Sequence, residues 1–285
     1  LFYRVFANEV LWPLFHDMTS RCRFEPEAWD VYSRINARFA DTVAGALNQD
    51  DFVWIHDYHL IRVARELRER GVQERLAFFL HIPFPPADVF LKLPWRREII
   101  EDLLEFDLVG FQTQRDRRHF ARCVSIMMGD EVSVRTTGGR TVIRRRDRER
   151  RVLAGAFPIS IDYRGFARDA SSPAVAERAW YVHENYPGRQ IILGVDRLDY
   201  TKGIPEKLRA YRHLLRTHPE LIEKVSLIQV VVPSRWEIPH YDRLKQEIER
   251  LTGRINGEFS RPGWIPVHYF YRSVPRADLL ACYRT

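Results

Sequence analysis

Short apolar runs alternate with helical segments along most of this chain, and that alternation limits the folds open to it. Each run has the length of a β-strand, and each is followed by apolar residues at helical spacing. The runs lie at 52–55, 76–80, 107–111, 190–195, 225–232 and 267–271. Strands that alternate with helices form parallel sheets, which helices usually cover on both faces. We therefore predict an α/β fold with parallel sheets covered on both faces.

Two helices are expected before the first of these strands. One begins at Trp12-Pro13, because proline is favoured in the first turn of a helix. The other begins at Glu25-Pro26-Glu27 and runs to about Leu47. Its apolar stripe is expected to consist of Trp29, Tyr32, Ile35, Phe39 and Val43.

Residues 132–160 interrupt the alternation. Val132–Arg135 and Thr141–Arg144 flank Gly138-Gly139, a pattern that predicts a β-hairpin. The second arm continues as an arginine-rich segment to Arg151. Such a cluster could touch nucleic acid, but acidic residues interrupt it and no aromatic residues interleave for base stacking. We therefore favour a solvated arm and expect no nucleic-acid partner.

The composition shifts to Ala, Ser, Pro and Gly between Ala170 and Gly188, around a short helix. A shift of this kind is typical of a domain boundary. We predict a first domain over residues 1–170 and a second over 187–285. The second holds only the last three predicted strands, fewer than such a domain normally has, so we expect the chain to be truncated at both ends.

The stretch from Gly194 to Gly203 joins a buried strand to a helix that opens at Ile204-Pro205. Ligands of open α/β sheets bind outside the carboxyl ends of the strands, and a helix N-terminus adds N–H groups and partial positive charge there. Arg197 offers a planar fork for phosphate oxygens and Lys202 a compact charge, a pair that suits a pyrophosphate. The alternative is an ordinary surface ion pair between Arg197 and Asp199, with Lys202 merely solvated.

Composition bears on location and partners. No run of about 18 uncharged apolar residues occurs, so no membrane span is expected. The first residues lack an initiator methionine and the pattern of a signal peptide. Cys22, Cys123 and Cys282 lie far apart, which argues for reduced thiols in a cytoplasmic protein. The net charge of +7 favours anionic partners, with sugar phosphates and nucleic acid as the candidates.

Several stretches together resemble the trehalose-6-phosphate synthases, and they follow that family's order through the whole chain. They are Asn8–Pro13, Trp54–Leu60, Phe79–Pro85, Gly110–Thr113, Asp196–Gly203, Pro233–Arg235 and Gly253–Gly257. The resemblance implies a retaining glycosyltransferase of two facing Rossmann-like domains, the GT-B arrangement. It implies that glucose passes from UDP-glucose to glucose 6-phosphate, which gives trehalose 6-phosphate and UDP.

The resemblance also implies roles for particular residues. It places the acceptor on Tyr3, Trp12, Asp57 and Arg235, and the donor on His81, Arg197 and Lys202. The residues it marks as catalytic are Arg197, Lys202, His81 and Asp57. It implies front-face substitution, in which the leaving phosphate helps to deprotonate the acceptor. We expect neither a cofactor nor a metal, since His56 and His59 lack a third ligand.

The family's glycine-rich loop upstream of Tyr3 and its downstream Asp-Gly-Met-Asn-Leu segment are absent from the sequence. The chain alone is therefore expected to be inactive. One alternative keeps the donor but uses another phosphorylated acceptor, as in the glucosylglycerol-phosphate synthases. Another is a regulatory homologue that binds sugar phosphate without catalysis. The sequence leaves open the nucleotide of the donor and the closure of the two domains. It also leaves open the oligomeric state, for which a homo-oligomer is one option.

Overall fold

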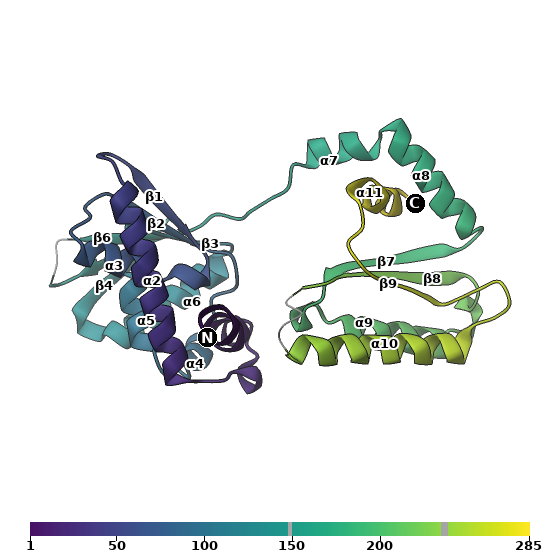
Figure 1. Cartoon of the computed structure of the whole chain (residues 1–285), viewed down its shortest axis with the longest axis horizontal. Coiled ribbons are helices and arrows are strands. Elements are labelled where there is room, and N and C mark those ends of the chain that lie inside the picture. Colours follow the sequence, from purple (N-terminus) through teal and green to yellow (C-terminus); the bar gives the residue numbers. More distant parts are fainter. Residues whose placement is uncertain (148–149, 235–238) are drawn as a thin grey trace. The chain divides into compact units, whose positions relative to one another are not determined.

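The computed structural model describes residues 1–147, 150–234 and 239–285 (Figure 1). Contacts divide the chain into two compact units, Leu1–Ser160 and Ile161–Thr285. The division falls ahead of segment 170–188, where the composition predicts a boundary. Helices α7 (Tyr163–Ala170) and α8 (Pro173–Asn185) belong to the second unit. There α8 packs against α11 (Arg276–Arg284) through a buried cluster of Val175, Ala179, Leu280 and Ala281.

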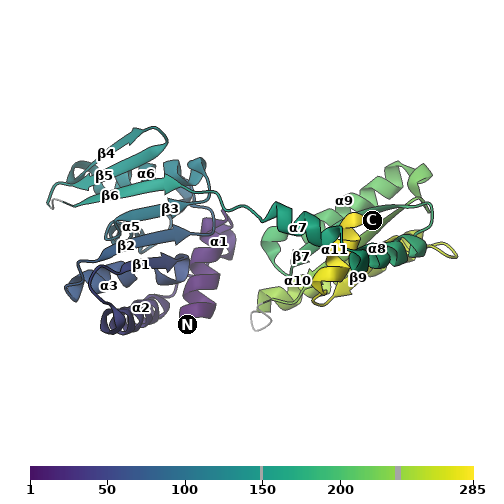
Figure 2. The same ribbon diagram turned by 90° about the horizontal axis from the view of Figure 1, so that it is seen from above.

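The first unit contains a six-stranded sheet in the order β1-β2-β3-β6-β5-β4 (Figure 2). Four parallel strands form most of it: β1 (Phe52–His56), β2 (Arg75–Leu80), β3 (Leu108–Phe111) and β6 (Arg151–Ala156). Strands β4 (Val132–Thr137) and β5 (Arg140–Arg145) form the predicted hairpin. Gly138 and Gly139 connect them with φ of 57° and 76°, angles that glycine adopts readily. The predicted α/β fold and the hairpin are confirmed.

Strand β6 is missing from the sequence prediction, which is wrong to continue the second hairpin arm to Arg151. In the structure β5 ends at Arg145 and a new strand begins at Arg151. Its last residues, Ala-Gly-Ala, are weak β-formers and hide the strand in the sequence. Gly155 of β6 pairs with Gly110 of β3, and a Cβ on Gly155 would lie 2.7 Å from the ring of Phe157. The glycine is thus needed where that ring folds back over the sheet.

Helices cover one face of this sheet in the described part of the chain, and not both faces as predicted. Helices α3 (Val63–Glu69), α5 (Arg96–Leu103) and α6 (Gln114–Met128) follow β1, β2 and β3 and pack side by side. Because the order β1-β2-β3-β6 advances in one direction, right-handed crossovers put these helices on the same face. Side chains on the other face are exposed, among them Phe52, Trp54 and Leu153.

The chain is helical from Phe2, earlier than the predicted start at Trp12-Pro13. A π-helix over Phe2–Leu11 runs directly into α1 (Trp12–Phe15). Pro13 has no N–H to donate to the preceding turn, and the carbonyl of Glu9 accepts instead from the N–H of Arg23 at 2.9 Å. The proline therefore lies inside a continuous helical segment.

Helix α2 (Pro26–Ala46) occupies the predicted segment but buries a partly different stripe. Its buried residues are Ala28, Tyr32, Asn36 and Ala40, whereas Phe39 is 47% exposed. The predicted stripe is therefore right at Tyr32 and wrong at Phe39, and its other members are only half-buried, because a polar contact orients the helix. The side-chain amide of Asn36 donates to the carbonyls of Tyr32 and His59, and so ties α2 to the loop after β1.

The second unit has a three-stranded parallel sheet in the order β7-β8-β9. Strands β7 (Gln190–Arg197), β8 (Val225–Val232) and β9 (Val267–Tyr271) lie at the predicted positions. Helices α9 (Ile204–Thr217) and α10 (Pro239–Phe259) share one core with the sheet, which includes Leu208, Val231 and Ile248. In the part of the chain that is described, no helix is long and apolar enough to cross a membrane.

Candidate active site

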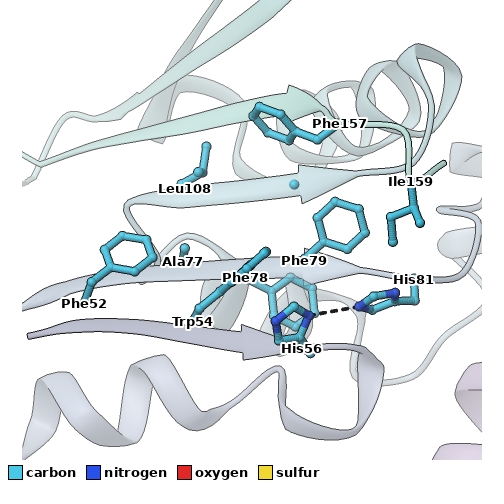
Figure 3. A pocket seen from close by; sticks show the side chains of 11 residues that line it. Phe52, Trp54, His56, Ala77, Phe78, Phe79, His81, Leu108, Phe157 and Ile159 are labelled. Atoms are coloured by element: carbon cyan, nitrogen blue, oxygen red, sulfur yellow. Dashed lines mark hydrogen bonds between the residues drawn. The ribbon is translucent and has the colours of Figure 1, made fainter. Parts of the chain in front are cut away.

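The loops after β1 and β2 bring polar side chains together at the carboxyl edge of the first sheet. His56 ends β1, and its Nδ1 lies 2.9 Å from Nε2 of His81, which follows β2 (Figure 3). The backbone N–H of His81 donates to Oδ1 of Asp57 at 3.2 Å. The parallel register pairs His56 with Phe79, and this places the two loops beside each other. Asp57 and His81, which the sequence singles out separately, are thus in direct contact.

Aromatic side chains of β1 and β2 pack against the two imidazole rings. The ring centroids of Trp54 and His56 are 4.4 Å apart, and those of Phe79 and His81 are 4.9 Å apart. These rings line a hollow of about 390 Å³ on the exposed face of the sheet, with Phe157 on its far side (Figure 3). The histidines are its polar end, so it offers an apolar surface next to hydrogen-bonding groups.

Asp57 has a backbone conformation that disfavours every residue but glycine. Its φ is 70° and its ψ is 165°. Its N–H donates to the carbonyl of Phe79 at 2.8 Å, so the pairing with β2 keeps the backbone in place. Strain of this kind costs about 1–3 kcal/mol and persists mostly at functional sites. An aspartate therefore occupies this strand end although its backbone conformation favours glycine.

Replacing Asp57 by glycine is expected to leave the chain more stable than replacing it by alanine, by about 1–2 kcal/mol in the free energy of unfolding. Glycine relieves the backbone strain, whereas both variants lose the carboxylate. Urea unfolding of the two variants measures the difference. Asp130, which lies in a short 3-10 helix without positive φ, is the control, and there glycine should be the less stable choice. Equal stabilities at position 57 would show that the site is not strained.

Tyr3 and Trp12 lie against the segment that follows Asp57. The ring of Tyr3 stacks on that of His59, with centroids 5.6 Å apart and planes at 11°, and its side chain is 51% exposed. Trp12 is 7% exposed, and its centroid is 5.8 Å from that of Tyr58. The hydroxyl of Tyr58 donates to Asn8 at 3.2 Å, which fastens the π-helix to this loop. The structure therefore gathers Tyr3, Trp12, Asp57 and His81 around residues 56–59.

The junction after β7 has the strand, loop and helix that the sequence predicts. Asp199 is buried, and its Oδ1 accepts from the N–H and the hydroxyl of Thr201, both at 2.9 Å. The hydroxyl of Tyr241 donates to its Oδ2 at 3.3 Å. Gly203 has a φ of 61°, which lets the chain turn into α9 with Pro205 in the first turn. The loop is therefore fixed by its own hydrogen bonds before any ligand binds.

The carboxylates nearest to Arg197 and Lys202 in sequence have other partners. Asp196 pairs with Lys207 at 2.7 Å, and Asp199 holds Thr201 and Tyr241. Within residues 1–147, 150–234 and 239–285, no carboxylate pairs with Arg197 or Lys202, and both side chains are exposed. The surface pair between Arg197 and Asp199 that the sequence leaves open is thus absent from this part of the chain. Two cations remain available at the carboxyl end of β7.

The predicted site residues fall in both units. Tyr3, Trp12, Asp57 and His81 are in the first, and Arg197 and Lys202 are in the second. Arg235, which is predicted to bind the acceptor, lies outside the described residues. The sequence reading does not single out Tyr58 as a contact of Trp12, or His59 as the ring under Tyr3. Their signal is their position directly after Asp57 at a strand end.

Two α/β units with polar side chains at the carboxyl ends of parallel strands match the architecture of the GT-B class of glycosyltransferases. Ligands of such sheets bind outside the carboxyl ends of the strands. This chain belongs to glycosyltransferase family 20, whose family model matches residues 1–285.

This chain spans about three fifths of the length of the following similar proteins. The 56 kDa subunit of the UDP-forming alpha,alpha-trehalose-phosphate synthase of Kluyveromyces lactis is 40% identical over 99% of this chain and 57% of its own length. A Burkholderia xenovorans enzyme of that name, in complex with glucose-6-phosphate, has a TM-score of 0.93 at 35% identity. The match covers 100% of this chain and 62% of that one. The E. coli protein bound with UDP-2-fluoro glucose has a TM-score of 0.91 at 37% identity, over 99% of this chain and 61% of that one.

Proposed function

We propose that this chain is part of a retaining glucosyltransferase that moves glucose from UDP-glucose to glucose 6-phosphate and forms trehalose 6-phosphate. The observation that carries the proposal is the pair of exposed cations, Arg197 and Lys202, that no described carboxylate neutralises. They lie where β7 ends and α9 begins. A pyrophosphate is the ligand that two such cations and a helix N-terminus suit best.

The proposed donor chemistry follows from charge. When the bond between the sugar and UDP breaks, negative charge builds on the β-phosphate. Cations already in place stabilise that charge more than they stabilise the bound donor, so they lower the barrier. In this proposal Arg197 and Lys202 hold the leaving phosphate, and His81 hydrogen-bonds the donor sugar.

The proposed acceptor site uses the cluster around residues 56–59. Trp12 covers a sugar face, Asp57 accepts hydrogen bonds from sugar hydroxyls, and Tyr3 bonds a phosphate oxygen. Arg235 is proposed as a second phosphate ligand. The mutual contacts of Asp57 with His81 and of Tyr3 with His59 support a common site. The glucose-6-phosphate in the Burkholderia complex supports the same acceptor here.

The test is UDP release by the full-length protein that contains this chain, supplied with UDP-glucose and one acceptor at a time. Release that needs glucose 6-phosphate is the expected result. Release only with glycerol 3-phosphate would keep the donor site and overturn the acceptor assignment. Absence of release with either would favour another nucleotide donor or a regulatory protein.

The location of the protein in the cytoplasm is proposed with the function and rests on its separated cysteines.

A further inference from the structure

The exposed face of β4, β5 and β6 carries a set of arginines. In antiparallel strands, directly opposite residues point to the same face. The registers pair Arg144 with Arg151, Arg135 with Val142, and Arg140 with Thr137. Arg135, Arg140, Arg144 and Arg151 therefore share one face, which we call the arginine face, and all of these side chains are exposed. The strands lie at one end of the first sheet, away from β1 (Figure 2).

The opposite face of the same strands is buried under α6. Ile143 and Val152 are buried there, and the guanidinium of Arg117 from α6 donates to the hydroxyl of Thr141. The arginine face thus points away from the helices that cover the sheet. Two nearby arginines outside it are neutralised, since Arg145 pairs with Asp147 and Arg150 with Asp107, both at 2.9 Å.

The members of the arginine face differ from these neighbours. Across the described ranges, no carboxylate pairs with any of its members. Arg144 and Arg151 are direct cross-strand neighbours, an arrangement in which like charges destabilise a sheet. The repulsion is relieved when an anion lies between them.

A hollow of about 470 Å³ lies over this face. Its polar lining consists of the guanidiniums of Arg135, Arg140 and Arg144 and the hydroxyls of Ser133 and Thr137. Each of these groups can donate a hydrogen bond, and no carboxylate or aromatic side chain is among the described lining residues. The volume suits a small molecule.

We propose that the arginine face binds a chain of condensed phosphate groups. Guanidinium forks bind phosphate oxygens in pairs, and several forks on one face match several phosphates in a row. No aromatic ring is among the described residues that line the hollow. The ligand would therefore be recognised through its phosphates and not through stacking of a base. Inorganic oligophosphate and the triphosphate of a nucleotide share this chemistry.

The experiment titrates inorganic tripolyphosphate into the 285-residue chain by calorimetry. The chain used in every titration carries Arg197→Ala and Lys202→Ala, so that the proposed donor site contributes no binding. The result then tests the arginine face separately from the proposed function. Arg135→Gln and Arg144→Gln are each expected to weaken binding about tenfold or more, the loss of one charge-assisted contact. Arg122→Gln, an exposed arginine on α6, is the matched control and should leave binding unchanged.

A parallel titration with ATP distinguishes the two sources. Equal affinities identify the phosphate chain itself as the ligand, and tighter ATP binding identifies a nucleotide. A third titration uses polyglutamate, a polyanion without phosphate. Absence of binding, equal losses in the Arg122→Gln control, or tighter binding of polyglutamate than of tripolyphosphate would overturn the proposal.

Independently of any ligand, Arg144→Gln should raise the unfolding temperature in low salt by about 1–3 °C, because it removes the repulsion with Arg151. A lower unfolding temperature would contradict the like-charge argument.

Discussion

Replacing Arg197 by alanine is expected to lower the rate of UDP release by about 10²–10³-fold in the full-length protein. The guanidinium is exposed at the end of β7 and has no carboxylate partner among the described residues, so its charge is free to act on a ligand. Removing it takes away stabilisation of the phosphate charge that develops as the donor breaks. Lys202→Ala should act in the same direction, and the double variant should lose less than the product of the two effects.

The measurement is steady-state UDP release with saturating UDP-glucose and glucose 6-phosphate. The loss should appear mainly in kcat, with the KM for glucose 6-phosphate little changed, because the cations act on the leaving phosphate. Arg216→Ala is the matched control, since Arg216 is an exposed arginine of α9 that pairs with Glu258 at 2.7 Å. Full activity in Arg197→Ala, or an equal loss in the control, would remove Arg197 from the proposed site.

Replacing Asp102 by alanine is expected to lower the free energy of unfolding by about 3–5 kcal/mol at neutral pH. Asp102 of α5 is 0% exposed. It accepts from Nη1 of Arg62 at 3.0 Å and from Nε of Arg65. Its loss leaves two largely buried guanidiniums without their common partner. Urea unfolding measures the change, and Asp278→Asn, in an exposed pair with Arg178, should cost less than about 1 kcal/mol.

The pH dependence of this effect has a definite sign. Burial raises the pKa of Asp102 from 3.8 to about 6, although the charges of Arg62 and Arg65 lower it. The folded protein therefore holds this proton more tightly than the unfolded chain does. The stability that the protonated carboxyl contributes is complete below pH 3.8 and is lost as the pH rises through about 6.

The comparison that isolates this group is the natural chain against Asp102→Asn, which cannot titrate at that position. The difference in the free energy of unfolding between them should fall by about 2 kcal/mol from pH 4 to pH 7. Unfolding by urea at several pH values gives the curve. A difference that rises with pH would mean that pairing with the arginines outweighs burial.

Much of the fold could be predicted because its signals are local. Apolar runs of strand length followed by helical spacing mark β1, β2, β3, β7, β8 and β9. Gly138-Gly139 marks the hairpin, since the turn needs positive φ. Strand β6 was not predictable in the same way. Its alanines and glycine form a strand because Gly155 pairs with Gly110, which is distant in sequence, and leaves room for the ring of Phe157.

The prediction that helices cover both faces of the first sheet was wrong, and the predicted stripe of α2 was right only in part, for a related reason. Periodicity shows that a helix has an apolar side, but it does not show what lies opposite. Asn36 is buried because two carbonyls accept from it, one of them on His59. Which face of the sheet the helices cover follows from the strand order, a property of the whole unit.

The sequence by itself determined which residues stand at strand ends, because the chain leaves a parallel sheet where an apolar run stops. Asp57, His81 and Arg197 follow from that rule, and Lys202 lies in the loop between the strand that Arg197 ends and the next helix. Only the tertiary structure decided their surroundings. It sets the strain at Asp57 and the contact of His81 with His56. It also pairs Asp196 with Lys207, so that Asp196 does not neutralise Arg197. These depend on strand register and on side chains from other elements. Such contacts form between residues far apart in the chain, and local sequence does not encode them.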